Sequence, residues 1–267
     1  MSVLKCKIMN KKDKMYIASC SFGKDSIATI LLALENNEPL DRVVFAEVMF
    51  DNEKGISGEI PEHIEWVYEV AIPKLKSMGV KVDVVKAEKD YVSLCKTILK
   101  KGKNKGKMYG LQNSFPCYAN SELKIRPIRS YYSKMSNDYD IVQYVGIAID
   151  EPKRLMRLEG TNKVSLLAKY GYTEKMAMDK CRDYNLLSPL YSMGYRGGCW
   201  FCYNANIERF VHMRTNYPKY WGELRNLYNE TNSNFFKYGF SLAEVEKKMD
   251  AIEFNERMHL KFDFNEL

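Results

Sequence analysis

The stretch that decides the fold runs from residue 15 to residue 26 and reads MYIASCSFGKDS. Its first half, Met15–Cys20, is a strand-like run, and apolar residues at helical spacing follow between Ile27 and Leu34. A turn of small and hydroxyl-bearing residues therefore joins a strand to the first turn of a helix. Backbone N–H groups point outward from such a turn and the helix dipole adds positive potential, so the sequence predicts an anion site.

Residues 21–26, SFGKDS, supply the groups that an anion site needs. Ser21 and Ser26 can donate hydroxyl hydrogens, Gly23 lets the backbone approach a ligand, and Lys24 adds a positive charge. The Walker A pattern G-x-x-x-x-G-K-S/T does not occur at this loop, so the loop is not of that type. The alternative is a polar strand-to-helix turn that binds nothing.

Strand-like and helix-like segments alternate through the first 150 residues. Further strand-like segments span 42–50, 80–86 and 141–149, and helix-like segments span 26–36, 61–78 and 91–100. Pro73 predicts either a kink in the second of these helices or a helix start near it. The alternation indicates crossover units, so we predict an α/β fold with a mainly parallel sheet flanked by helices. Ligands of such sheets bind at the carboxyl ends of the strands, where residues 21–26 and Asp51 would lie.

The second half of the chain reads as helical and carries most of the clustered cysteines. Helix-like segments span 172–185, 206–215, 218–231 and 241–259. Thr173 fits an N-cap, and Ser241 with Glu244 fits a capping box. We predict two domains, a nucleotide-binding α/β domain at 1–155 and a helical region at 156–267 that contains a metal or cluster site.

Length, charge and cysteine usage limit the class of protein. The net charge of +7 over 267 residues suits a phosphate-rich ligand but does not by itself indicate nucleic-acid binding. No apolar run approaches the roughly 20 residues that span a bilayer, and the first residues form no signal peptide. We therefore expect a cytoplasmic protein without a membrane partner. Its seven cysteines, an odd number, argue against a disulfide framework.

The positive charge is concentrated in Lys100–Lys107, which holds five lysines in eight residues. One interpretation is a mobile, solvated loop. The other is a clamp over phosphates of a nucleotide or a nucleic acid.

Two further segments combine polar groups that could face a nucleotide. Residues 115–129 hold Cys117 and a basic cluster that includes Lys124. This cluster could bind phosphate or sulfate through several hydrogen bonds, or it could be a solvated helix face. Residues 144–157 end a strand-like run with Gly146, Asp150 and Arg154. The alternative for Asp150 is the N-cap of a helix that starts there.

The motif R-G-G-C-W-F-C at 196–202 is the strongest sign of a metal site. Its two cysteines, Cys199 and Cys202, hold two thiolates on one tight loop, which suits tetrahedral Zn²⁺ or one edge of an iron–sulfur cluster. Cys117 and Cys181 are the best candidates for the remaining ligands. Cys181 could instead be a small core residue.

Four segments together resemble a known family. Residues 21–26 resemble the pyrophosphate-binding loop of the PP-loop ATP pyrophosphatase (adenine nucleotide alpha hydrolase-like) superfamily, and Phe22 is typical of its phosphoadenosine phosphosulfate (PAPS) reductase-like family. Residues 117–127, 144–154 and 187–202 are similar to family elements in the same order. Phe115-Pro116 departs from the tryptophan that usually precedes the family cysteine.

The resemblance implies ligands and roles for individual residues. It implies ATP or PAPS as the nucleotide, with Mg²⁺ beside it, and a [4Fe-4S] cluster or Zn²⁺ on the cysteines. The implied catalytic residues are Lys24, Asp25, Lys124 and Arg154. The implied nucleotide-binding residues are Ser21, Phe22, Gly23, Lys24, Asp25, Ser26, Asp51, Gly146 and Asp150, with Gly146 admitting the base. The implied metal ligands are Cys117, Cys181, Cys199 and Cys202.

These implications favour an enzyme that splits ATP into AMP and pyrophosphate to adenylate an acceptor, with sulfur transfer as one use of the adenylate. The runner-up is a PAPS or adenylyl-sulfate reductase. It is disfavoured because such reductases use a C-terminal cysteine, whereas the last cysteine in this sequence is Cys202. The third alternative is a non-catalytic module that binds nucleotide or nucleic acid, the latter through Lys100–Lys107.

Overall fold

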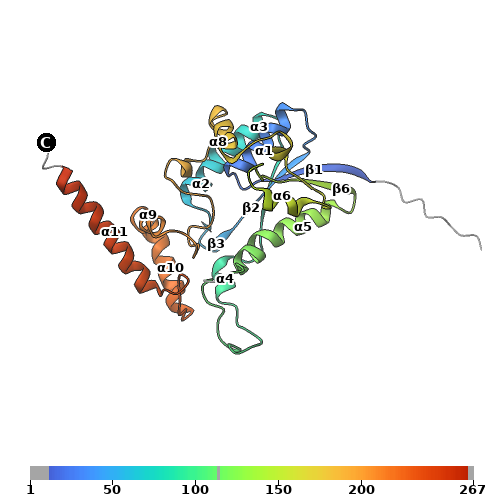
Figure 1. Ribbon diagram of the computed structural model, residues 1–267. Coiled ribbons are helices and arrows are strands. Elements are labelled where there is room, and N and C mark those ends of the chain that lie inside the picture. The colour runs from blue at the N-terminus through green and yellow to red at the C-terminus, as the bar shows by residue number, and fades with distance from the viewer. Residues whose placement is uncertain (1–11, 113–114, 264–267) are drawn as a thin grey trace, which may run out of the picture. The chain divides into compact units, whose positions relative to one another are not determined.

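The computed structural model describes residues 12–112 and 115–263 (Figure 1). The chain forms two compact units, each assembled from three stretches of sequence. The first unit takes the residues up to Phe45, Glu69–Val84 and Ile128–Ser188, and the second takes Ala46–Tyr68, Val85–Pro127 and the residues from Pro189 onwards. The sequence predicts two consecutive domains, 1–155 and 156–267. The structure differs because the long connections between parallel strands leave the first unit and later return to it.

The central feature of the fold is a five-stranded sheet in the order β5-β2-β1-β6-β7. The pairings of β1 with β2, of β1 with β6 and of β6 with β7 are parallel. Helices separate these strands along the chain, so the predicted α/β fold is confirmed. The strands are β1 (Asp13–Ser19), β2 (Arg42–Glu47), β5 (Val82–Lys86), β6 (Tyr139–Tyr144) and β7 (Lys163–Val164).

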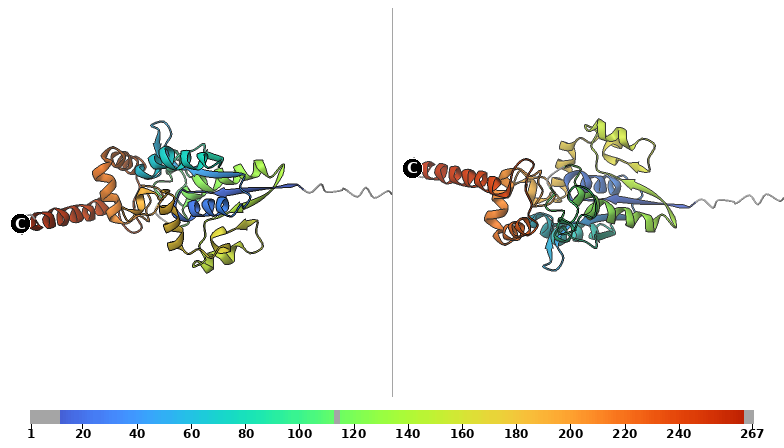
Figure 2. Two further views of the ribbon diagram at one scale, coloured as in Figure 1. Left: turned by 90° about the horizontal axis from the view of Figure 1, so that it is seen from above. Right: turned by 90° about the horizontal axis from the view of Figure 1, so that it is seen from below.

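Helix α1 (Lys24–Glu35) is the most buried helix of the first unit and starts directly after the loop that follows β1. Every residue from Ser26 to Ala33 is buried. The helix packs against α7 (Leu166–Lys169) and α8 (Glu174–Asp183), which lie beside it in both views of Figure 2. The other helices that belong wholly or mainly to this unit are α3 (Ile72–Ser77), α5 (Arg126–Met135), α6 (Pro152–Leu155) and the 3-10 turn Met156–Leu158.

The helix predicted at 61–78 forms with an irregular centre. It consists of α2 (Pro61–Trp66), a π-helical turn at Val67–Ala71 and α3. The irregular turn comes just before Pro73, which has no N–H to donate to the preceding turn. The predicted disturbance at Pro73 is therefore present, as a wide turn before the proline.

The second unit combines a small antiparallel sheet with helices. The sheet pairs β3 (Met49–Asp51) with β4 (Ile56–Ser57). Its core is rich in aromatic side chains, among which Phe50, Trp200 and Phe210 are fully buried. The helices of this unit are α2, α4 (Tyr91–Cys95), the π-helical turn Asn120–Ile125, the 3-10 turn Pro189–Tyr191, α9 (Ile207–Asn216), α10 (Pro218–Glu230) and α11 (Leu242–Asp263).

Two predicted helix caps are confirmed. The Thr173 hydroxyl accepts the N–H of Met176 at the start of α8. At the start of α11, the Ser241 N–H donates to Glu244 Oε2 (2.7 Å) and the Glu244 N–H donates to Ser241 Oγ (3.3 Å). Within the described residues, no helix is both long enough and apolar enough to cross a membrane.

Candidate nucleotide site and thiol cluster

The loop between β1 and α1 is anchored by the side chain of Phe22. This residue has φ of +56°, an unusual conformation for a bulky side chain. Its ring is fully buried and packs edge-on against Phe45, with ring centroids 5.1 Å apart. Phe22 was predicted to bind the nucleotide. With its side chain in the core, only its backbone is left to reach a ligand.

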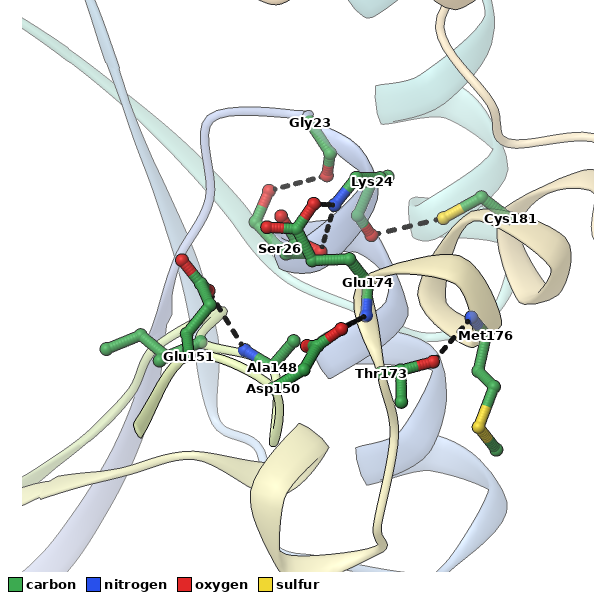
Figure 3. Close-up of polar contacts among 12 residues, drawn as sticks. Gly23, Lys24, Ser26, Ala148, Asp150, Glu151, Thr173, Glu174, Met176 and Cys181 are labelled. Atoms are coloured by element: carbon green, nitrogen blue, oxygen red, sulfur yellow. Dashed lines mark hydrogen bonds and ion pairs between the residues drawn. The ribbon is translucent and has the colours of Figure 1, made fainter. Parts of the chain in front are cut away.

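The hydroxyl of Ser26 holds the loop in shape (Figure 3). It donates to the carbonyl oxygen of Gly23 (2.9 Å) and accepts the N–H of Ser21 (3.3 Å). Ser26 itself is buried, whereas Ser21 is exposed. Ser26 therefore organises the turn from within, and Ser21 is the better placed of the two to meet a ligand.

The N-terminus of α1 is the anion-binding element of the loop. Gly23 occupies the N-cap position and provides no side-chain cap hydrogen bond. The first N–H groups of a helix have no partner within the helix, so an anion can accept from them. This end of α1 follows the carboxyl end of β1, a strand with parallel neighbours on both sides.

Gly146 lies against this same turn. A Cβ atom at Gly146 would lie 2.7 Å from the carbonyl carbon of Asp25 and 2.8 Å from the nitrogen of Ser26. Only glycine fits such an approach of two backbones. The family resemblance implies that Gly146 admits a base. In the structure, the lack of a side chain at Gly146 lets the segment after β6 pack on the first turn of α1.

Lys24 is held between two carboxylates. Its Nζ lies 2.8 Å from Asp25 Oδ1 and 3.1 Å from Glu174 Oε2, and only 11% of its side chain is exposed. Burial lowers the pKa of Lys24, but the hydrogen bonds and charges of Asp25 and Glu174 outweigh it and raise the pKa. Burial raises the pKa of Asp25, which Lys24 partly offsets. Lys24 is therefore a fixed positive charge at neutral pH.

Glu174 was not among the predicted site residues. It is the first residue of α8, and the spacing of 150 residues to Lys24 leaves no local pattern that would pair the two. Its N–H donates to both carboxylate oxygens of Asp150, at 3.2 and 3.3 Å. Asp150 thus supports the start of α8, which brings Glu174 to Lys24 (Figure 3).

The remaining predicted residues of this segment make local contacts. Glu151 stands at the N-cap position of α6, the position that the alternative interpretation gave to Asp150. Its carboxylate accepts the N–H of Ala148 and forms an ion pair with Arg154, whose side chain is half exposed. Asp51 belongs to the second unit, where it is buried and accepts the N–H of Lys54 (3.0 Å).

Cys181 belongs to the first unit and packs against α1. It is completely buried, and its thiol donates to the carbonyl oxygen of Lys24 (3.2 Å). Burial and the charge of Asp25 raise the pKa of this thiol to about 12. A buried thiol that is already hydrogen-bonded fits the alternative interpretation, in which Cys181 is a small core residue and not a metal ligand.

The other three predicted cysteine ligands all belong to the second unit. Cys199 pairs with Glu59 through a backbone bridge, and the N–H of Trp200 donates to the Gly58 carbonyl (3.0 Å). The two residues between the cysteines, Trp200 and Phe201, are buried in the aromatic core, while Cys199 and Cys202 stay half-buried. The C-x-x-C loop is therefore held in place by its two apolar residues, while part of each flanking cysteine residue stays accessible.

Cys117, Cys199 and Cys202, here termed the thiol cluster, influence one another electrostatically. Burial raises the pKa of Cys199 far above its usual range, Glu59 and the other two thiols raise it further, and Lys124 lowers it. Burial also raises the pKa of Cys117. The N–H of Asn120, which donates to the Cys117 sulfur (3.4 Å), acts in the opposite direction. Three of the four predicted ligands therefore belong to one unit and act on one another through their charges, as Lys124 does on Cys199.

Two cations, the buried Arg209 and the partly exposed Lys237, lie near the thiol cluster. Arg209 donates to the carbonyl oxygen of Cys199 (2.7 Å), and Lys237 donates to those of Tyr203 (2.9 Å) and Ala205 (2.6 Å). Burial lowers the pKa of both side chains, and Cys202 acts in the opposite direction on each. Among described residues neither cation has an ion-pair partner, and the buried Nε of Arg209 makes no hydrogen bond. An added negative charge at the cluster would therefore be stabilised.

The fit of a metal to these residues can be judged from the donor set. Three thiols near the buried Arg209 and the partly exposed Lys237 suit a thiolate-bound group of net negative charge. In the described residues, no three or more His, Cys, Asp or Glu side chains are arranged to hold a metal ion. The donor chemistry fits a thiolate-bound group, and binding would require the three side chains to turn toward it.

Comparisons with known proteins give little beyond this geometry. No protein-family model matches the chain, and no curated protein matches it. Among solved structures, the chain is similar to the U34-tRNA thiolase NcsA from Methanococcus maripaludis with its [4Fe-4S] cluster. The identity is 14%, the match covers 83% of this chain and 72% of that chain, and the TM-score is 0.41. Likeness of this degree is too weak to assign an activity.

Proposed function

We propose that the protein binds an adenine nucleotide at residues 21–26 and splits ATP between the α- and β-phosphates, transferring AMP to an acceptor. The observation that carries the proposal is the loop after β1. It combines an N-cap without a side-chain partner, the buried anchor Phe22 and the fixed cation Lys24. These groups suit the pyrophosphate, which gains negative charge as it leaves.

Lys24 has the central role in this proposal. In the structure its ammonium group is occupied by Asp25 and Glu174, so a bound phosphate competes with at least one of these carboxylates. Mg²⁺ enters as the partner of ATP, and Asp25 and Glu174 are the carboxylates next to Lys24 that could reach it. Asp51, Asp150 and Arg154 as nucleotide contacts, and Lys124 on the acceptor side, remain predictions.

We also propose that Cys117, Cys199 and Cys202 hold an iron–sulfur cluster or Zn²⁺. When bound, such a group would supply an electrophilic metal at which a sulfur donor can attach. Arg209 and Lys237 would stabilise its negative charge, and Cys199 and Cys202 would fix it to the aromatic core through Trp200 and Phe201. We leave Cys181 out of this set because its thiol is already bonded to the Lys24 carbonyl.

Product analysis after incubation with Mg-ATP tests the nucleotide proposal. AMP and pyrophosphate are expected, and ADP with inorganic phosphate would refute the proposed bond cleavage. Lys24→Gln should weaken pyrophosphate binding by about 10- to 100-fold, because it removes a charged hydrogen bond of about 1.5–3 kcal/mol. Lys175→Gln is the matched control, because Lys175 is exposed and adjoins Glu174. Equal pyrophosphate affinity in both variants would count against the site.

Metal analysis of anaerobically purified protein tests the thiol cluster. Iron or zinc is expected, and Cys117→Ser should lower its content. Cys181→Ser should leave it unchanged, whereas an equal loss in that variant would restore Cys181 as the fourth ligand. Protein with neither metal, or with full loading in Cys117→Ser, would contradict the proposed cluster site.

A further inference from the structure

The lysine-rich segment Lys100–Lys107 forms an ordered hairpin. The N–H of Leu99 donates to the Lys107 carbonyl (2.9 Å), the N–H of Gly106 donates to the Leu99 carbonyl (2.8 Å), and Ile98 pairs with Met108 in an antiparallel bridge. Gly102 and Gly106 take the positive φ values that the tip requires. The hairpin follows α4 and is visible as the long teal and green loop beside the α4 label in Figure 1.

The charge on this hairpin is not neutralised by the protein. All of residues 101–107 are exposed, and in the described part of the chain none of the five hairpin lysines takes part in an ion pair. Other lysines of the same unit do, since Lys96 pairs with Glu230 (2.9 Å) and Lys86 with Glu47 (2.9 Å). A row of unpaired lysines favours a polyanionic partner.

Exposed aromatic rings lie next to the hairpin. The rings of Tyr109 and Tyr118 are in contact, with centroids 5.1 Å apart. Gln112 Oε1 accepts both the Tyr109 hydroxyl (3.1 Å) and the Tyr118 N–H (3.0 Å), so the pair is held in place. Tyr118 is 41% exposed and Phe115 is 89% exposed. A ring exposed to the degree of Phe115 is not stabilised by packing in the protein core.

These rings adjoin the thiol cluster. Cys117 stands in the chain between Phe115 and Tyr118. Burial raises the pKa of Tyr109, and the nearby Tyr118, Cys95 and Cys117 raise it further. From the lysine hairpin the chain therefore runs through Tyr109 and Phe115 to Cys117 and Tyr118.

We propose that the hairpin Lys100–Lys107 together with Tyr109, Phe115 and Tyr118 binds single-stranded nucleic acid. The lysines contact its phosphates, the rings stack on its bases, and a base is thereby brought to the thiol cluster. Lysines alone would suit a duplex equally well, but only unpaired bases can stack on side chains. This inference rests on the proposed function, because it names a nucleotide of a single strand as the acceptor.

The lysines can be tested through the salt dependence of binding. Fluorescence anisotropy with labelled single-stranded RNA and DNA oligonucleotides would be measured over a range of salt concentrations. Neutralising Lys101, Lys103, Lys105 and Lys107 to Gln should reduce the slope of log affinity against log salt by up to about three. The control variant neutralises four exposed lysines elsewhere, Lys76, Lys134, Lys219 and Lys247, which gives the same net charge. Equal slopes in the two variants would overturn the assignment.

The aromatic rings need a second pair of variants. Phe115→Ala with Tyr118→Leu should weaken binding by about 5- to 150-fold for each base that loses its stacking partner, while the salt slope stays unchanged because the charges remain. Tyr238→Ala is the control, since Tyr238 is 77% exposed in the same unit. Equally tight binding of a duplex, or of polyglutamate, would refute a single-stranded ligand. Comparing the affinities for the RNA and DNA oligonucleotides shows whether the protein prefers ribose or deoxyribose.

Failure of this inference can be separated from failure of the proposed function. Calorimetry with ATP should give the same affinity for the hairpin and aromatic variants as for the unchanged protein. ATP binding and cleavage without any oligonucleotide binding would refute the nucleic-acid surface alone. Oligonucleotide binding by a protein that never binds ATP would refute the proposed function alone.

Discussion

At the scale of single residues, the sequence revealed those whose role follows from their neighbours in the chain. Ser21, Gly23 and Lys24 lie within six residues of one another, and their types already indicate an anion site. Glu174 could not be found in this way, because its pairing with Lys24 depends on α8 packing beside α1. The loop-shaping role of Ser26 was also hidden, because a hydroxyl that donates to a carbonyl looks the same in sequence as one that donates to a ligand.

Gly146 offers a residue-scale test of the loop. Gly146→Ala should destabilise the protein by about 1–3 kcal/mol, because its Cβ would overlap the backbone of Asp25 and Ser26. The same change should weaken ATP binding, since it displaces the first turn of α1. Urea unfolding and calorimetry measure the two effects.

Gly222→Ala is the control for this change. Gly222 lies inside α10, and no neighbouring segment comes within 4 Å of the position that a methyl group would take there. Alanine should therefore be neutral or stabilising by up to about 1 kcal/mol. If Gly146→Ala is as stable as Gly222→Ala and binds ATP normally, the close approach has no importance for the site.

At the scale of elements, the spacing of apolar residues predicted the bounds of a helix well where one face of the helix is buried. The helix expected at 218–231 forms as Pro218–Glu230, with Trp221, Leu224 and Leu227 on its buried face. The expected strand at 42–50 is instead divided into β2 and β3. A continuous apolar run shows that a segment is buried but not where its pairing changes, so the division could not be predicted.

The C-x-x-C loop gives an element-scale prediction about pH. Burial raises the pKa values of Cys117 and Cys199, so both are protonated at neutral pH in the metal-free protein. Metals bind the thiolates, so each of these thiols must release a proton on binding. The logarithm of Co²⁺ affinity should therefore rise with pH, by about one unit per pH unit for each thiol that ionises.

Absorbance titrations with Co²⁺ between mildly acidic and mildly alkaline pH measure this slope. Cys95→Ala is the control, because burial raises the pKa of Cys95 to about 12 and Cys95 lies outside the thiol cluster. The control should keep the full slope, whereas Cys117→Ser should lose about one unit of it. Affinity that does not change with pH would show that the thiols are already ionised.

At the scale of the whole molecule, the α/β class could be predicted but the composition of the two units could not. Each unit combines stretches from three parts of the sequence, and three of the four predicted metal ligands fall in one unit while Cys181 falls in the other. Motif spacing along the chain does not show which stretches fold together. That information lies in the packing of the buried faces.

The choice between adenylation and reduction also belongs to this scale. A reductase that attacks PAPS needs a reactive thiolate, and Cys199 or Cys202 would have to supply it. Burial raises the pKa of Cys199, so the thiolate is scarce at neutral pH and the thiol is a poor nucleophile. A role as a metal ligand avoids this difficulty, because the metal itself displaces the proton.

We therefore expect no sulfite formed through Cys199 when the protein is incubated with PAPS and thioredoxin. Under matched conditions, Mg-ATP with single-stranded RNA or DNA should yield pyrophosphate. Lys24→Gln should abolish most of that yield, because it removes the positive charge that we propose stabilises the leaving group. Sulfite release that disappears in Cys199→Ser, without pyrophosphate from ATP, would replace the adenylating enzyme by a reductase. Tight ATP binding with neither product would instead leave a nucleotide-binding module, in which Lys24 contributes affinity but takes part in no reaction.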